Sequence, residues 1–210
     1  SRGLGDVYKR QIEEKSAARK RLGLPDCLTI LSAGGSQGAS RLNEAVVQLL
    51  AYEQKKGNIN HIHGYGKHGR DTFMQSLADN GVDAGNPHFI IKEYIDNMYT
   101  CMCASDLIIT RAGAMTLTEI TAIGRASVLI PYPYAAENHQ YYNALTLQNA
   151  NAGRIIDDKE LTGSVLIDTV NRLADDPELL RLMSENAAKL SKRDAAGIIL
   201  REITELMGIK

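Results

Sequence analysis

The feature of this sequence that most constrains its fold is a repeated junction, at which a short apolar run meets glycine and then an amphipathic segment. One such junction follows the apolar residues 107–109 and passes through Gly113. An earlier one follows the apolar residues 28–31 and passes through the glycine-rich loop at residues 34–38. Junctions of this kind are typical of a strand, a tight turn and a helix start, which is the repeating unit of parallel α/β folds.

The same alternation of elements continues along most of the chain. Continuous apolar runs predict strands, and apolar residues at helical spacing predict the helices between them. The predicted strands are residues 28–31, 59–63, 88–92, 107–110, 127–130 and 154–156, and the predicted helices between them are residues 42–50, 73–78, 95–103, 116–123 and 138–149. Because the strands are continuous apolar runs, helices should cover both faces of the sheet. The sequence therefore predicts an α/β fold with a doubly wound, six-stranded parallel Rossmann-like sheet.

The two ends of the chain show other patterns. Residues 1–23 are interpreted as a ragged segment followed by a charge-rich linker helix. Beyond the last predicted strand the pattern is helical, with Asp176 and Pro177 opening one helix and Asp194 opening the last. Residues 24–210 are therefore expected to form one domain that includes a helical C-terminal tail. Because the chain does not begin with Met, it is interpreted as part of a longer protein.

Composition argues against several classes of partner and site. The chain has 210 residues and a formal net charge of -1, so its charge balance indicates neither nucleic acid nor an anionic membrane surface. The three cysteines lie in apolar patterns without zinc or redox spacing, and they are expected to be buried thiols in a reducing compartment. His61 and His63 would share one strand face, but no carboxylate or thiol motif joins them, so no metal site is predicted. Without a signal peptide or a long apolar span, the chain is expected to be cytoplasmic.

The glycine-rich loop at residues 34–38 has two interpretations. Its sequence, Gly-Gly-Ser-Gln-Gly, matches neither the dinucleotide fingerprint nor the P-loop. It could be a tight turn that needs glycine for steric reasons alone. Alternatively, its backbone amides and the hydroxyl of Ser36 could bind a phosphate at the start of a helix. The junction at residues 110–119 has the same potential, and the two together could hold one nucleotide diphosphate.

Thr116 and Glu119 also allow two interpretations. Their spacing is that of a capping box, in which Thr116 caps the helix and Glu119 reaches back, and the motif alone favours this cap. A carboxylate turned outward could instead accept two hydrogen bonds from the vicinal hydroxyls of a ribose. Gln140 and Asn143, three positions apart on one helix face, are either solvated or suited to reading sugar hydroxyls.

Taken in order, these motifs resemble the carboxyl-terminal half of the MurG family, bacterial N-acetylglucosaminyltransferases of the GT-B fold that form the peptidoglycan precursor lipid II. The matching stretches are residues 34–39, 94–98, 111–116 with Glu119, and 139–140 with 143–144. They keep the order and spacing of the family over about residues 22–206. The resemblance implies the donor-binding half of an inverting transferase, which moves N-acetylglucosamine from UDP-N-acetylglucosamine to lipid I.

The resemblance also implies a role for each candidate residue. The residues expected at the diphosphate belong to the two helix-start loops: Gly35, Ser36, Gln37, Gly38, Ala114, Met115 and Thr116, with Arg111 adding positive charge. Ile95 would present backbone groups to uracil, and Glu119 would bind the ribose. The residues expected at the sugar are His139, Gln140 and Asn143. No catalytic residue, cofactor or bound metal is expected in this half of the family.

The acceptor-binding amino-terminal domain of the family, with its proposed general base and membrane-docking patch, is not found in the chain. The chain is therefore expected to bind the sugar nucleotide without transferring the sugar alone. The full-length protein is expected to be peripheral on the cytoplasmic face of the membrane, with the lipid-linked acceptor bound through the missing domain. The last predicted helix, which carries Ile198 and Leu206, would pack partly on that domain, and its apolar face could promote self-association.

Two alternatives stay open from the sequence. The chain could be a half-transferase subunit that works with a separate membrane-bound partner supplying the acceptor site. It could also be a non-catalytic module that binds nucleotide sugars, because a fold alone does not give a function.

Overall fold

The computed structural model describes residues 12–191 and is built around one six-stranded sheet. The strands are β1 (Leu28–Ala33), β2 (Ile59–Gly64), β3 (Phe89–Lys92), β4 (Leu107–Thr110), β5 (Ala126–Leu129) and β6 (Gly153–Ile155). Their order is β3-β2-β1-β4-β5-β6, and each neighbouring pair is parallel. The predicted doubly wound parallel sheet is confirmed.

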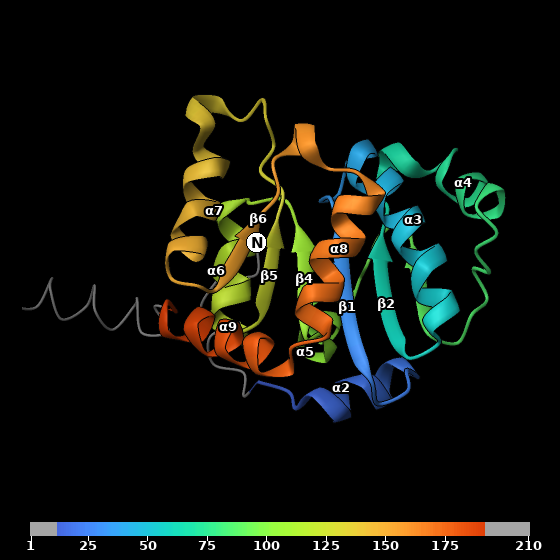
Figure 1. The fold of residues 1–210 in the computed structure, drawn as a ribbon, viewed down its shortest axis with the longest axis horizontal. Coiled ribbons are helices and arrows are strands. Elements are labelled where there is room, and N and C mark those ends of the chain that lie inside the picture. The colour runs from blue at the N-terminus through green and yellow to red at the C-terminus, as the bar shows by residue number, and fades with distance from the viewer. Residues whose placement is uncertain (1–11, 192–210) are drawn as a thin grey trace, which may run out of the picture.

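Helices cover both faces of this sheet (Figure 1). They are α2 (Lys15–Leu22), α3 (Ser40–Lys56), α4 (Phe73–Asp79), α5 (Met98–Ala104), α6 (Ala114–Ile123), α7 (His139–Asn149), α8 (Gly163–Ala174) and α9 (Pro177–Lys189). Three short 3-10 turns, η1 (Lys67–Gly69), η2 (Ala136–Asn138) and η3 (Asp158–Glu160), lie in the connections. Helices α3 and α8 pack against each other on one face, and α2 packs against α5 on the other.

Alternate residues of the central strands belong to two separate cores. In β1, Ile30 belongs to the core beneath α3, α4 and α8, whereas Leu31 belongs to the core beneath α2, α5, α6 and α7. In β4, Ile109 and Ile108 divide in the same way. Successive side chains of a strand point to opposite faces, so a sheet that is covered on both sides needs continuous apolar runs.

Cap geometry confirms some predicted helix ends and corrects another. The side chain of Asp176 accepts a hydrogen bond from the N–H of Leu179, and Pro177 is the first residue of α9, as predicted. The helix predicted over residues 95–103 begins only at Met98. The apolar pattern included Ile95, but Ile95 is buried in a loop, against Gly64 at the end of β2. Residues 1–11 and the helix expected from Asp194 lie outside the described residues.

A chain of buried polar side chains crosses the core between β1, β2 and α3. Ser32 Oγ lies 2.7 Å from His61 Nε2 and 2.7 Å from His63 Nδ1. His61 Nδ1 lies 2.7 Å from Glu53 Oε2. No sequence motif places a carboxylate beside the two histidines, and Glu53 reaches His61 only because α3 packs onto β2. Among the described residues, no group of three or more His, Cys, Asp or Glu side chains is placed to hold a metal.

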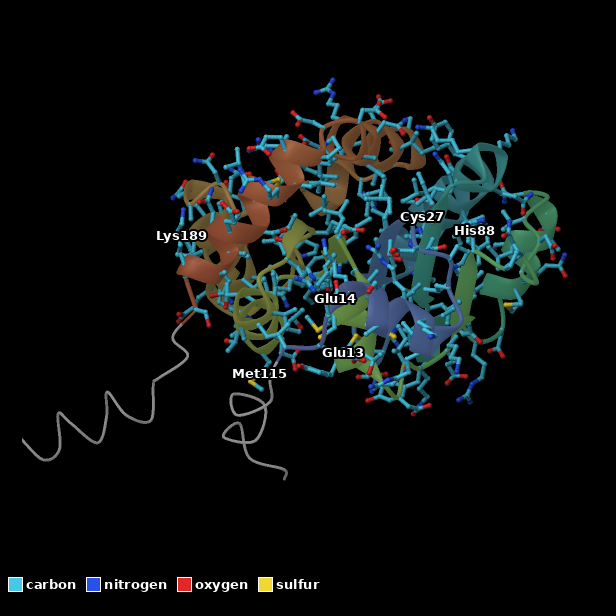
Figure 2. The ribbon with its side chains drawn as sticks, turned by 90° about the horizontal axis from the view of Figure 1, so that it is seen from below. Glu13, Glu14, Cys27, His88, Met115 and Lys189 are labelled. Atoms are coloured by element: carbon cyan, nitrogen blue, oxygen red, sulfur yellow. The ribbon has the colours of Figure 1, made fainter. Side chains whose placement is uncertain are left out.

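The three cysteines differ in their burial. Cys101 and Cys103 are buried, as predicted, and burial raises the pKa of the Cys101 thiol to about 11. Cys27 is only partly buried, because it precedes β1 at the amino edge of the sheet, where its Sγ lies 3.9 Å from His88 Nδ1 (Figure 2). Within residues 12–191, no helix is long and apolar enough to cross a membrane.

Candidate functional site

The strand order creates a topological switch point between β1 and β4. From β1 the chain continues to β2 on one side, and from β4 it continues to β5 on the other. The connections therefore separate at the carboxyl ends of these two strands, which is where open α/β sheets bind ligands. A pocket of about 80 Å³ lies there, lined by Leu31, Ala33, Gly35, Met98, Met102, Ile108, Thr110, Thr116 and Glu119. Three of the predicted site residues, Gly35, Thr116 and Glu119, thus meet in one pocket.

The glycine-rich loop owes its shape to close contact with the loop after β2. Gly38 has a φ of 84°, and a Cβ on it would lie 2.3 Å from the carbonyl oxygen of Tyr65. Gly66 has a φ of 69°, and a Cβ on it would lie 2.2 Å from the amide nitrogen of Gly38. Both positions therefore require glycine, for conformation and for space. The steric interpretation of the loop is supported, and it does not exclude the binding interpretation.

A Gly38→Ala variant tests this contact. We expect a loss of about 2 kcal/mol in the free energy of unfolding, because the methyl group meets backbone in a left-handed conformation. Urea denaturation followed by circular dichroism gives the value. Gly57→Ala is the matched control, because Gly57 also has a positive φ, 67°, but has open space around its missing Cβ. An equal loss in both variants would show that the contact with Tyr65 costs nothing.

The same loop presents free amides at the switch point. The carbonyl oxygens of Ser36 and Gln37 accept hydrogen bonds from Lys67 and His68, at 3.2 and 2.8 Å. These bonds fix the peptide groups that carry the two carbonyls against the loop that follows β2. The amide N–H groups of Ser36 and Gln37 make no hydrogen bond within residues 12–191. They are consequently available to an anion.

Helix α6 begins differently from the sequence prediction. Its first residue is Ala114, and its N-cap is Gly113, which has no side chain to cap the helix. Thr116 is therefore the third residue of the helix, and the capping-box interpretation of Thr116 and Glu119 is wrong. The reason is that Gly113 already has the extended backbone of an N-cap, with φ -67° and ψ 141°. Helix α3 also lacks a capping side chain, because its N-cap is Ala39.

The two helices that begin at the switch point therefore both expose uncapped amides there. Side chains cap α2, α8 and α9, whereas α4, α5 and α7 also lack a capping side chain, so the place of α3 and α6 at the switch point is what distinguishes them. Uncapped N-terminal amides and the positive end of the helix dipole favour a bound anion. The side chain of Met115 protrudes from the start of α6 and is 58% exposed (Figure 2).

Glu119 forms part of the pocket wall one turn beyond Thr116. Its side chain is half-buried and makes no hydrogen bond to any described residue. Burial raises the pKa of its carboxyl group above the ordinary value. A desolvated carboxylate without a partner is costly unless a ligand supplies donors.

The predicted sugar-reading residues lie at the start of α7, outside the pocket lining. Gln140 Oε1 accepts a hydrogen bond from the Tyr132 amide at 3.0 Å. Asn143 Nδ2 donates to the Ala112 carbonyl at 3.2 Å, which ties α7 to the loop before α6. His139 Nδ1 lies 2.8 Å from the Ala136 carbonyl oxygen. Each side chain thus uses one polar atom on the protein backbone.

Two further predicted residues also lie outside the pocket lining. Ile95 is 5% exposed, and its amide N–H makes no hydrogen bond within the described part of the chain. Arg111 forms an ion pair with Asp158, with Nη1 and Oδ1 2.5 Å apart. Its charge is therefore already paired. Sequence reasoning missed Asp158, which lies in an acidic 3-10 turn that carries no motif.

Comparison with known proteins agrees with this geometry. The profile of the "Glycosyltransferase family 28 C-terminal domain" matches residues 29–198. The chain belongs to this family. The glycosyltransferase family 28 assignment confirms the resemblance that the motifs carry, and the sheet order and helix layers are those expected of the carboxyl-terminal half of a GT-B enzyme.

The chain matches about half of each of two curated relatives. It is 38% identical over 183 residues to a protein of Desulforamulus reducens named "UDP-N-acetylglucosamine--N-acetylmuramyl-(pentapeptide) pyrophosphoryl-undecaprenol N-acetylglucosamine transferase", covering 87% of this chain and 49% of that protein. A relative of the same name from Thermoanaerobacter sp. is 40% identical over 205 residues, covering 96% and 56%. The chain therefore spans about half the length of the curated relatives it matches.

Solved structures show the same relationship. The crystal structure of Acinetobacter baumannii MurG superimposes with a TM-score of 0.74 at 29% identity, covering 93% of this chain and 54% of that one. The C-terminal domain of a group 1 glycosyl transferase from Francisella tularensis superimposes with a TM-score of 0.62 at 16% identity, covering 90% and 96%. At that identity the second match shows a shared fold alone.

Proposed function

We propose that the chain is the donor-binding half of an N-acetylglucosaminyltransferase that uses UDP-N-acetylglucosamine and glycosylates the lipid-linked muramyl pentapeptide, lipid I, to form lipid II. The observation that carries the proposal is the pair of uncapped helix starts at the switch point, with the unpartnered carboxylate of Glu119 beside them. A nucleoside diphosphate offers what this arrangement lacks, because its phosphates accept hydrogen bonds and its ribose hydroxyls donate them.

In this proposal the diphosphate binds between the two helix starts. The loop amides of Ser36 and Gln37 and the first amides of α6, from Ala114 to Thr116, donate to its oxygens. The hydroxyl of Ser36 adds a further donor. These groups and the two helix dipoles stabilise the negative charge that develops on the departing UDP, without a metal ion.

The nucleoside and the sugar bind on either side of the diphosphate. Glu119 accepts hydrogen bonds from the ribose hydroxyls, and the backbone of Ile95 meets the uracil. Gln140 Nε2 and Asn143 Oδ1, which have no partner among the described residues, read the sugar hydroxyls. An amide can both donate and accept, so this pair suits a sugar with defined hydroxyl geometry.

Transfer requires the half that the longer relatives have in addition. That half would supply the acceptor site and the general base, and would place the whole enzyme on the cytoplasmic face of the membrane. Self-association through residues beyond 191 stays a prediction, because those residues lie outside the described part of the chain.

Calorimetric titration tests the proposal directly. The 210-residue chain is titrated with UDP-N-acetylglucosamine, UDP and UDP-galactose, with and without a chelator. We expect one UDP-N-acetylglucosamine per chain, weaker binding of UDP-galactose, and no effect of the chelator. With lipid I as the acceptor, the chain alone should give no product above a control without protein. Absence of nucleotide binding, or turnover by the chain alone, would contradict the proposal.

A further inference from the structure

The carboxylate of Asp158 joins two arginines that come from distant elements. Its Oδ1 lies 2.5 Å from Nη1 of Arg111, the residue that directly follows β4. Its Oδ2 lies 3.7 Å from Arg41 Nε, in the first turn of α3, and Arg41 Nη1 donates to the Asp158 carbonyl at 2.9 Å. The side chains of Asp158 and Arg111 are each only 14% exposed, so water screens this pair little.

Arg111 in turn holds the loop that leads to α7. Its Nη1 donates to the carbonyl oxygens of Ile130 and Pro131, at 3.2 and 3.4 Å. Its guanidinium carbon lies 5.7 Å from the centre of the Tyr132 ring. The amide N–H of Tyr132 then donates a hydrogen bond to Gln140 Oε1. An unbroken series of contacts therefore runs from Asp158 through Arg111 and this loop to Gln140.

The loop needs such support, because its backbone is strained. Glu137 and Asn138 have φ angles of 50° and 55°, in the left-handed region, although neither is glycine. Conformations of this kind are costly for residues other than glycine, more so for Glu137 than for Asn138, and they persist only where the surroundings enforce them. Arg111 binds the loop at residues 130 and 131, before these two residues. Gln140, in the helix after them, binds the loop at Tyr132.

We propose that Asp158 is a positioning residue for the sugar end of the donor site. Its ion pair fixes the side chain of Arg111, which in turn fixes residues 130–132; we call these contacts the clamp. Because Tyr132 binds Gln140, the clamp fixes the position of Gln140 at the start of α7. The charge of Arg111 is then neutralised by Asp158 and acts on the loop rather than on phosphate. The inference rests on the proposed function, because it assigns the network to the sugar of a nucleotide sugar.

Asp158→Asn tests the inference, since it removes the charge and keeps the shape. The dissociation constants of UDP, UDP-N-acetylglucosamine and UDP-galactose are measured by calorimetry for the parent and the variant. We expect the preference for UDP-N-acetylglucosamine over UDP-galactose to fall about tenfold, because a small misplacement of reading groups has effects of this size or larger. The affinity for UDP should change less than about threefold, because Asp158 does not contact the groups proposed to donate to the diphosphate, which are Ser36, Gln37 and the first amides of α6.

Two further variants make the test specific. Glu160→Gln lies in the same 3-10 turn, is exposed and has no ion pair among the described residues, so it should leave all three constants unchanged. Arg41→Gln removes the outer arginine, which is half-exposed, and should lower sugar discrimination in the same direction by a smaller factor. If Asp158→Asn does not fold, the measurements on Arg41→Gln test the inference in its place.

The outcomes separate the inference from the proposed function. If the parent distinguishes the two sugars and Asp158→Asn or, failing that, Arg41→Gln distinguishes them equally well, the inference is wrong and the proposed function stands. Equal weakening of all three ligands would also overturn it, since that is the signature of general destabilisation. A parent that binds no UDP compound would overturn both.

Discussion

Replacement of Glu119 by alanine is expected to weaken UDP binding about 100-fold, or about 2.7 kcal/mol. The carboxylate lines the switch-point pocket without a partner among the described residues. Two hydrogen bonds from ribose hydroxyls to a charged, half-buried acceptor account for a loss of this size. Calorimetry on parent and variant measures the change, and Glu119→Gln, which keeps one acceptor oxygen, should lose less.

The same variant separates the ribose role from a capping role through its stability. Because Gly113 is the N-cap of α6, Glu119→Ala should leave the free energy of unfolding within about 0.5 kcal/mol of the parent. Thr118→Ala, at the exposed neighbouring position on α6, is the matched control and should keep full nucleotide affinity. Intact UDP binding together with a loss of about 1 kcal/mol in stability would restore the capping interpretation.

Lowering the pH from 7 to 4 is expected to destabilise the fold by about 3 kcal/mol through His63 alone. Complete burial, and then the charge of His61, lower the pKa of His63 to about 3 in the folded chain. In the unfolded chain it takes up a proton near the ordinary value of 6.5. Between these two pKa values the unfolded chain binds a proton that the folded chain does not. The free energy of unfolding is therefore highest above the unfolded pKa and falls as the pH drops toward the folded pKa.

The measurement is a series of urea denaturations at pH values from about 4 to about 8, followed by circular dichroism. His63→Phe removes the titrating group and keeps a flat ring against Phe73, with which His63 stacks at 4.8 Å. The slope of stability against pH should then become shallower by up to about 1.4 kcal/mol per pH unit. An unchanged slope would show that His63 is not the group that takes up the proton.

The order of elements and the location of the site were accessible from local sequence patterns. The apolar runs at Ile30 and Ile108 identify strands that helices cover on both faces, because the side-chain period of a strand is short and local. Gly38 marks its turn for an equally local reason, because its φ of 84° favours glycine. The motifs around Ser36 and Glu119 then point to the carboxyl edge of a parallel sheet.

Other features could not be read from local patterns. Thr116 has the spacing of a cap, and only the backbone of Gly113 shows that the helix begins earlier. Glu53 carries no signal of its own, and the packing of α3 on β2 brings it to His61. In each case the deciding contact depends on a backbone conformation or a packing angle, which short patterns do not encode.

The sequence by itself determined the fold class, the family motifs and their order, because these rest on spacing along the chain. Tertiary structure alone decided which polar groups meet. Arg41 and Asp158 are 117 positions apart and share a hydrogen bond, and Arg111, which the motif places near phosphate, is bound to that same aspartate. The physical reason is that strands distant in sequence end at one edge of the sheet, where charges pair with the nearest partner in space.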